Sequence, residues 1–129
     1  MEFDENYVLQ TRSNVDLGAL AANKLLNLKN PPDAIFSSSD FAALGAIQEI
    51  TKHGIKIPED FCVVGFGNEP FTKFMELSIS SIDQSPLEMG KMAAKAFLEQ
   101  INNTENFKIE KKIVLNAELN IRKSSSRTR

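Results

Sequence analysis

Residues 34–66 hold two short apolar segments on either side of one amphipathic helix, and this arrangement limits the possible folds most strongly. The segments are AIFSS at 34–38 and FCVVGF at 61–66. Between them, apolar residues recur at helical spacing, at Phe41, Leu44, Ile47 and Ile50. A strand, a helix and a strand of this total length form one β-α-β unit. Strands that are apolar throughout are typical of a parallel sheet covered on both faces.

Two more helices are predicted from capping residues and apolar spacing. The sequence SNVD at 13–16 offers N-cap residues, and the prolines of KNPPD end this first helix. Its predicted apolar face consists of Leu17, Leu20, Ala21, Leu25 and Leu28. The last helix is predicted over 86–101, where the sequence SPLE provides a capping box with proline at the first helical position.

Three further strands complete the predicted order of elements. Residues 6–10 could form a short strand, and residues 77–83 and 111–122 alternate between apolar and polar side chains, which is the period of a half-buried strand. The resulting order is β-α-β-α-β-β-α-β. This order predicts an α/β fold with a mostly parallel sheet flanked by helices.

Polar residues follow three of the predicted strands at their carboxyl ends, at 37–40, 67–68 and 83–84. Ligands of open α/β sheets bind outside the carboxyl ends of the strands, so this pattern predicts a polar ligand cleft at one edge. Gly67 belongs to this edge, and the sequence leaves two interpretations of it open. The glycine lets the chain turn, or it lets the backbone approach a ligand closely.

Catalytic and metal-binding arrangements have no support in the sequence. His53 is the only histidine, and it ends the helix whose start carries the serines of 37–39, about 20 Å away at 1.5 Å per helical residue. Cys62 lies inside an apolar strand, as a core residue would. Neither a His-x-x-x-His nor a Cys-x-x-Cys motif occurs. We therefore predict that the chain is not an enzyme and holds neither a metal nor a cofactor.

Charge and hydropathy exclude two further classes of partner. The net charge is −2, so no overall basic field attracts nucleic acid. No stretch approaches the roughly 18 apolar residues of a membrane span.

A single cysteine fits a reducing cytoplasm. The basic, serine-rich end IRKSSSRTR is predicted to be a solvated tail.

Four large apolar residues cluster in a predicted loop, namely Phe71, Phe74, Met75 and Leu77. They could cover an edge of the sheet, or they could contact another protein chain. We favour the contact with another chain, because large exposed apolar clusters are typical of interfaces.

Three segments together resemble the LacI/GalR family of bacterial transcriptional regulators. They are PPDAIFSSSDFAALGAIQEITKHGIKIPEDFCVVGFGNEPF, SSIDQSPLEMGKMAAKAFLEQI and NAELNIRKSS. They match, in turn, the family's strand–helix–strand region, its glutamine-containing strand end with the following helix, and its closing L-x-x-R-x-S segment. The resemblance covers about residues 13–126.

The resemblance implies a lobe of a periplasmic-binding-protein-like (type I) fold, in which two lobes enclose an effector. It implies that 1–84 form the C-terminal lobe and that 85–107 are a helix and loop of an N-terminal lobe absent from this chain. Residues 108–123 would be the returning strand, and 124–129 a disordered tail. The DNA-binding headpiece would also be absent. Without its own lobe, the helix at 86–101 must find another surface for its apolar face, which predicts an oligomer.

The resemblance also implies site residues. The ligand-binding positions fall on Ser13, Ser39, Gly67, Asn68 and Gln84. Gly67 replaces the usual aspartate and Ser13 replaces an aromatic residue, whereas Asn68 can both donate and accept hydrogen bonds. The positions of the homodimer interface fall on Phe41, Leu44, Ile47, Phe71, Phe74 and Met75.

Together these features predict a cytoplasmic regulator fragment that binds a sugar or sugar derivative, forms a homodimer and controls a DNA-binding headpiece by population shift. The sequence identifies neither the effector nor the operator. Two alternatives remain open. A solute-binding protein for transport would have the same cleft, and a small α/β hydrolase is disfavoured by the distance between His53 and the serines.

Overall fold

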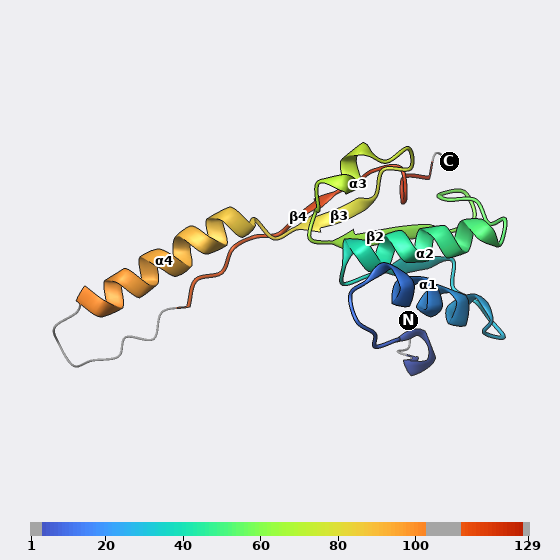
Figure 1. Ribbon diagram of the computed structural model, residues 1–129, viewed down its shortest axis with the longest axis horizontal. Helices are drawn as coiled ribbons and strands as arrows, with labels where there is room; N and C mark the ends of the chain where they lie inside the picture. Colours follow the sequence, from blue (N-terminus) through green and yellow to red (C-terminus); the bar gives the residue numbers. More distant parts are fainter. Residues whose placement is uncertain (1–3, 103–111, 128–129) are drawn as a thin grey trace.

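The computed structural model describes residues 4–102 and 112–127, which form an α/β body and a long projecting arm (Figure 1). The elements in chain order are η1 (Glu5–Tyr7), α1 (Val15–Leu26), β1 (Ala34–Phe36), α2 (Asp40–Lys52), β2 (Cys62–Phe66), α3 (Phe71–Phe74), β3 (Ser80–Asp83), α4 (Pro86–Asn102) and β4 (Glu118–Asn120).

The four strands form one sheet in the order β1-β2-β3-β4. Strands β1, β2 and β3 are parallel, with Ile35 opposite Val63 and Phe66 opposite Ile82. Strand β4 returns antiparallel to β3, with Leu119 opposite Ile82. The predicted β-α-β unit and the mostly parallel α/β sheet are therefore confirmed.

The core lies between one face of this sheet and the helices α1 and α2. Ile35 and Val63 project from neighbouring strands toward Ile47 and Ile50 of α2, and Ala22 of α1 completes the contact. The alternate strand positions point to the opposite face, where Phe36 is 61% exposed. The sequence predicted that both faces of the sheet are covered. Within the described part of the chain nothing covers most of the Phe36 side chain, so that prediction is wrong at this position.

Helices α1 and α2 approach each other closely, because two glycines leave room for the neighbouring backbone. A Cβ atom at Gly18 would fall onto the carbonyl oxygen of Ala42, and one at Gly45 would fall onto that of Val15. Asn23 adds a side-chain hydrogen bond from Nδ2 to Oε1 of Glu49, 2.9 Å long. This packing fixes where both helices begin, next to the carboxyl end of β1.

The ends of α1 and α2 follow the predicted signals, but their buried faces differ in detail. Asn14 caps α1, since its side chain accepts a hydrogen bond from the Leu17 nitrogen at 2.9 Å. Leu20 is 58% exposed, and the buried residues of α1 are Gly18, Ala22 and Leu25. The apolar spacing predicted a wider buried face for α1 than the structure shows, because α1 contacts α2 through a narrow row of small residues.

Three predicted strands differ from the structure. Residues 5–7 form the 3-10 helix η1 rather than part of a strand, because Asp4 accepts a hydrogen bond from the Asn6 nitrogen and turns the chain. Strand β3 is shorter than predicted and begins at Ser80. Within the predicted strand 111–122, position 111 lies outside the described residues and regular pairing is confined to Glu118–Asn120.

The C-terminal segment is part of the body, so the predicted tail at 124–129 is wrong for its described residues. Ser124 is completely buried, and its backbone bonds to Val63 of β2 and to Ser78, two residues before β3. Arg127 donates to the carbonyl oxygens of Asp33, Pro58 and Asp60. Serine and arginine here form hydrogen bonds with backbone groups of the body. Composition alone does not distinguish such residues from residues that are bonded only to water.

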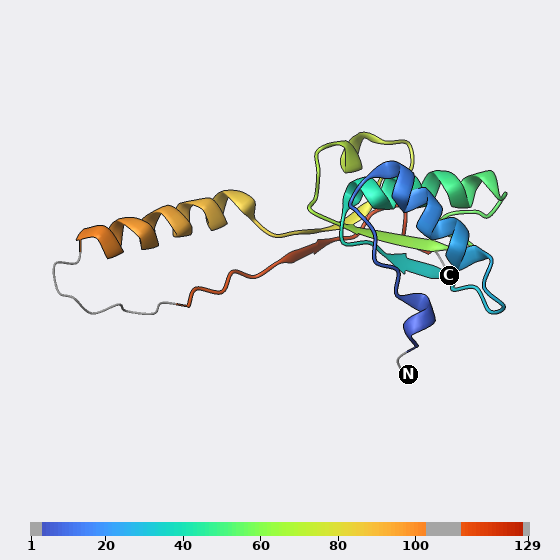
Figure 2. The same cartoon turned by 60° about the horizontal axis from the view of Figure 1, so that its bottom comes forward.

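Helix α4 leaves the body as an arm and none of its residues is buried (Figures 1 and 2). Residues 113–117 return beside it without regular strand pairing. Large apolar side chains, including Leu87, Phe97 and Ile101, remain exposed along the arm. Ser85 has φ of 55°, outside the extended range of the predicted N-cap, so the usual capping-box geometry is not formed.

Candidate ligand-binding edge

The carboxyl ends of β1, β2 and β3 lie side by side, so the structure brings the three polar segments to one edge. The ladder continues beyond β1 through Ser37, whose nitrogen donates to the Val64 oxygen at 2.8 Å. It continues beyond β2 through Gly67, whose nitrogen donates to the Ile82 oxygen at 2.9 Å. The edge therefore consists of 37–40, the loop 67–69 and 83–85.

Asp40 holds this edge together from inside. Its side chain is 1% exposed, and it accepts from the Glu69 nitrogen at 2.8 Å and from the Ser81 hydroxyl at 2.7 Å. A Cβ atom at Gly65 would fall onto the Asp40 carboxylate, so the glycine leaves the space that this carboxylate needs. The conformation of loop 67–69 thus depends on a carboxylate that is buried away from ligands.

Gly67 has a conformational reason to be glycine. Its φ is 120°, which residues with a side chain rarely adopt. The first of its two interpretations, that it lets the chain turn, therefore has direct geometric support. The same absence of a side chain leaves the backbone open to a close approach, so both interpretations remain compatible.

Asn68 uses its side chain within the protein. Its Nδ2 donates to Oδ2 of Asp83 at 2.8 Å, and its Oδ1 accepts from Nη2 of Arg122 at 2.6 Å. Its backbone has φ of 53°, a left-handed conformation that asparagine tolerates better than most residues. The amide has one further donor hydrogen and one further lone pair, which is all that it could offer a ligand.

Arg122 is the residue of this edge that the sequence reasoning missed, since it was assigned to the basic end of the chain. Its Nη1 donates to the Ile79 oxygen at 2.7 Å and to the Thr72 hydroxyl at 3.1 Å. The signal for its role was the arginine of the closing L-x-x-R-x-S pattern. Ser124, the serine of that pattern, is the residue buried between β2 and β3.

Asp83 is the charged acceptor at the end of β3. The side-chain amide of Asn68 and the backbone N–H of Ser85 donate to its carboxylate and hold its pKa below the ordinary value. Burial opposes these two hydrogen bonds more weakly, and the charges of Lys73 and Arg122 lower the pKa by smaller amounts still. Asp83 is therefore an anion at neutral pH, and its oxygens are directed toward protein donors.

The five predicted ligand residues do not share one pocket. Ser13 lines a groove of about 590 Å³ between the segment 7–13, α1 and β1. Gln84 lines a second groove of about 490 Å³ between α4 and the returning chain. Ser39 is buried at the start of α2, Gly67 and Asn68 are half-buried, and none of these three residues lines either groove. The described body thus presents an open edge rather than an enclosed cavity.

The predicted interface residues divide into a surface and a core group. Phe41 and Phe71 are in ring contact, with centroids 5.1 Å apart, and Phe74 beside them on α3 is 85% exposed. We call Phe41, Phe71 and Phe74 the aromatic surface. Leu44 and Met75 are half-buried against the core, whereas Ile47 is 6% exposed and belongs to the core itself. The side chain of Ile47 is therefore not available to a partner in this conformation.

The structure adds no catalytic or metal-binding arrangement within its described residues. His53 follows the last turn of α2, where its Nδ1 lies 2.9 Å from the Glu49 oxygen, at the opposite end of the helix from Ser39. Over 4–102 and 112–127, no group of three or more histidine, cysteine or acidic residues could hold a metal ion. None of the helices in these ranges is both long and apolar enough to cross a membrane.

A mostly parallel α/β sheet with its polar strand ends at one edge defines a class of protein that binds small ligands at that edge. Comparisons with known proteins identify the family. Residues 2–125 match the model of the periplasmic binding protein-like domain. The chain therefore belongs to the periplasmic binding protein-like domain family, in the form found in LacI-type transcriptional regulators.

Individual relatives agree with this assignment. The chain is 35% identical over 98 residues to the HTH-type transcriptional repressor CytR of Escherichia coli, which covers 76% of this chain and 29% of the repressor. It is 34% identical over 113 residues to the NTD biosynthesis operon regulator NtdR of Bacillus subtilis, covering 87% and 34%. The chain thus spans about a third of the length of the curated relatives that it matches.

Solved structures of regulators have the same fold. A putative LacI transcriptional regulator from Bacillus cereus subsp. cytotoxis superposes with a TM-score of 0.91 at 26% identity, over 98% of this chain and 44% of that one. The regulator CelR in complex with cellobiose superposes with a TM-score of 0.87 at 30% identity, over 97% and 38%. The predicted family and fold are therefore confirmed.

Proposed function

We propose that this chain supplies the C-terminal lobe and the crossing segments of the effector-binding domain of a LacI-type transcriptional regulator. The lobe, residues 1–84, binds one side of a small effector at the edge formed by 37–40, 67–69 and 83–85. A second lobe closes over the effector, and the change in lobe arrangement is transmitted to a DNA-binding headpiece outside this sequence.

One observation carries the proposal: three parallel strand ends present polar residues at a single edge. In open α/β sheets this is where ligands bind, since side chains and backbone N–H groups from several strands converge there. The buried Asp40 carboxylate fixes the loop 67–69 through the Glu69 nitrogen. A loop that is held in place before the ligand arrives loses less conformational freedom on binding.

The effector is proposed to be a sugar or a sugar derivative. Two LacI-family structures that resemble the chain contain ribose and sucrose, and CelR contains cellobiose. Serine hydroxyl groups at Ser13 and Ser39 and the amide of Gln84 suit hydroxyl-rich ligands, since each can donate and accept. Gly67 offers no side chain, so hydrogen bonds at this position would come from the backbone.

The arm supports the assignment of 85–107 to a second lobe and of 108–123 to the returning connection. Helix α4 has an apolar side bordering the groove with Met89, Ala93 and Ala96, but it buries none of its residues. An amphipathic helix that buries no face is stabilised only when another surface covers it. We assign that surface to the second lobe.

The homodimer is proposed to form through the aromatic surface. Phe41, Phe71 and Phe74 come from the start of α2 and from α3, and they place two large rings in contact beside a third that is exposed. Aromatic residues are enriched at protein interfaces, where they bury a large area with few rotatable bonds. The proposed location is the cytoplasm, where such a regulator meets DNA.

A transport protein of the same fold is the alternative that shares the cleft. The relatives reported above are a repressor and an operon regulator, which favours regulation over transport. They are not enzymes, and the separation of His53 from the serines gives hydrolysis no support.

A thermal-shift panel tests the proposed function on this chain, with ribose, cellobiose and sucrose as probes. Ligand that binds only the folded state raises the midpoint of unfolding, and the rise grows with the logarithm of the ligand concentration above its Kd. We expect at least one probe to raise the midpoint, and we expect Gln84→Ala to reduce that rise. Ser126→Ala, an exposed substitution away from the edge, is the control. A rise that Gln84→Ala leaves unchanged would contradict binding at this edge.

A further inference from the structure

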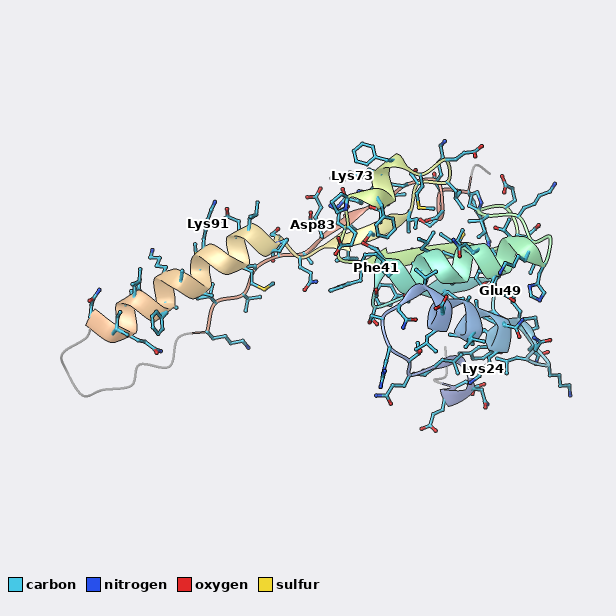
Figure 3. All side chains as sticks on the ribbon, viewed as in Figure 1. Lys24, Phe41, Glu49, Lys73, Asp83 and Lys91 are labelled. Carbon is cyan, nitrogen blue, oxygen red and sulfur yellow. The ribbon has the colours of Figure 1, made fainter. Side chains whose placement is uncertain are left out.

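Two connections join the body to the arm, and both pass the loop 67–69. The outgoing connection follows β3 through Asp83 to Ser85, and the returning connection enters β4 and continues to Arg122. Figure 3 shows Asp83 at the place where the chain leaves the body toward α4. A side chain of the loop that holds both connections would link the position of the arm to the conformation of the loop.

We propose that Asn68 is this positioning residue: its amide joins the loop 67–69 to Asp83 on the outgoing connection and to Arg122 on the returning one. A movement of the loop would then be passed to the arm through these two hydrogen bonds. The proposal rests on the geometry of the described residues, and it holds whichever ligand the edge binds.

The first link runs through the carboxylate of Asp83. Its Oδ2 accepts from Nδ2 of Asn68 at 2.8 Å, while its Oδ1 accepts from the backbone nitrogen of Ser85 at 2.7 Å. One carboxylate therefore holds the loop with one oxygen and the start of the outgoing connection with the other. Ser85 has φ of 55°, so its unusual conformation is supported by a charge-assisted hydrogen bond.

The second link runs through the guanidinium group of Arg122. Its Nη2 donates to Oδ1 of Asn68 at 2.6 Å, and its Nη1 donates to the Ile79 oxygen at 2.7 Å. The rigid fork fixes the angle between these donors, which a lysine could not do. The backbone nitrogen of Arg122 also donates to the Ser80 hydroxyl at 2.7 Å, so the returning connection is fixed to β3 directly beside the loop.

The loop itself is anchored on the other side, so it cannot absorb a displacement of Asn68. The Asn68 nitrogen donates to the Ser81 hydroxyl at 3.0 Å, and Ser81 donates in turn to Asp40. The amide of Asn68 donates to a carboxylate with one end and accepts from a guanidinium with the other. An aspartate at position 68 would keep the bond to Arg122 but would face Asp83 with a like charge.

This asymmetry gives a reciprocal test. Asn68→Asp breaks the link to Asp83 by repulsion, and the double variant Asn68→Asp with Asp83→Asn restores it with donor and acceptor exchanged. In the double variant, residue 83 donates to the new carboxylate and still accepts from Ser85. A residue that matters only for general stability would not be rescued by an exchange of this kind.

The first measurement is hydrogen exchange of the Ser85 amide by NMR on the full chain. We expect Asn68→Asp to speed exchange about tenfold, because a hydrogen bond to a charged group is lost. We expect the double variant to return the exchange rate close to that of the parent chain. Ser126→Ala is the control and leaves it unchanged. If Asn68→Asp does not fold, Asn68→Ala, which removes both links without repulsion, gives the same comparison against the parent chain.

The second measurement is the distance between body and arm, from spin labels at Lys24→Cys and Lys91→Cys in a Cys62→Ala background. Both lysines are exposed, one on α1 and one on α4 (Figure 3). We expect Asn68→Asp to broaden or shift the distance distribution and the double variant to restore it. An unchanged distribution in Asn68→Asp, or no rescue in the double variant, overturns the proposal.

Discussion

The hydroxyl group of Ser124 bridges two strands, so its removal provides a sharp prediction. Its Oγ donates to the Val63 oxygen at 2.6 Å and accepts from the Ser80 nitrogen at 2.8 Å, in a completely buried position. The hydroxyl thus bridges a backbone oxygen of β2 and a backbone nitrogen of β3. Ser124→Ala leaves both groups without this partner.

The expected magnitude follows from the number of groups that lose a partner. A buried backbone donor or acceptor left unsatisfied costs about 1–3 kcal/mol, so two such groups together predict a loss of about 2–4 kcal/mol after partial relaxation of the strands. The backbone bonds from Val63 to Ser124 and from Ser124 to Ser78 remain, which limits the loss. For a chain of this length, each kcal/mol lowers the melting temperature by roughly 3–5 °C.

Chemical denaturation followed by circular dichroism measures the free energy of unfolding, and the slope with denaturant shows whether the folded states are comparable. Ser126→Ala is the matched control, since the same change is made two residues away at an exposed position. We expect the control to lie within about 0.5 kcal/mol of the parent chain. An equal loss in both variants would refute the claim that the C-terminal segment is part of the folded body.

Three further predictions concern other parts of the molecule. Gly45→Ala should destabilise the protein by about 1–3 kcal/mol in chemical denaturation because its methyl group meets the backbone of α1, whereas Gly90→Ala, which meets nothing within 4 Å, should be neutral or slightly stabilising; equal effects would contradict the close helix packing. Asp83 and Glu49 both have a lowered pKa, so their contribution is present above the ordinary carboxyl value of about 4 and is lost as the pH falls through the lower folded values; Glu49→Gln should flatten this part of the stability–pH curve, and an unchanged curve would count against it. Phe74→Glu should dissociate the proposed homodimer in sedimentation velocity, and an unaltered dimer would remove the aromatic surface from the interface.

The central part of the fold was predictable because its signals are local and agree with one another. Helical spacing at 41–50 lies between two apolar segments, and the capping asparagine and the prolines bound α1. The strand at 6–10 was wrong because one side chain, Asp4, turns the chain through a hydrogen bond that apolar spacing does not report. Local patterns therefore predict elements well where packing and capping favour the same structure.

The C-terminal segment and the edge network could not be predicted from composition, because their residues are polar in the sequence yet bonded within the protein. Ser124 is typical of a solvated segment in its chemistry, but it completes the sheet through partners about 40 and 60 residues away. Asn68 and Arg122 meet only after the chain has returned through β4. Contacts of such sequence separation leave no periodic signal, so only the closing L-x-x-R-x-S pattern indicated them.

The prediction of individual ligand-binding residues was limited by the same cause, namely contacts between residues that are far apart in the sequence. Strand ends locate the edge, and the structure brings 37–40, 67–69 and 83–85 together there. Side-chain direction decides which residue lines which groove, and it places Ser13 and Gln84 in different ones. That direction depends on how α4 and the returning chain are placed, which no local pattern determines.

The most direct test of the central claim is a map of where a sugar touches this chain. Backbone amide shifts are followed by NMR while ribose, cellobiose or sucrose is added to the labelled protein. We expect saturable shifts that concentrate at 37–40, 67–69 and 83–85. Saturable shifts confined to the opposite end of the sheet, at 53–61, would contradict this assignment.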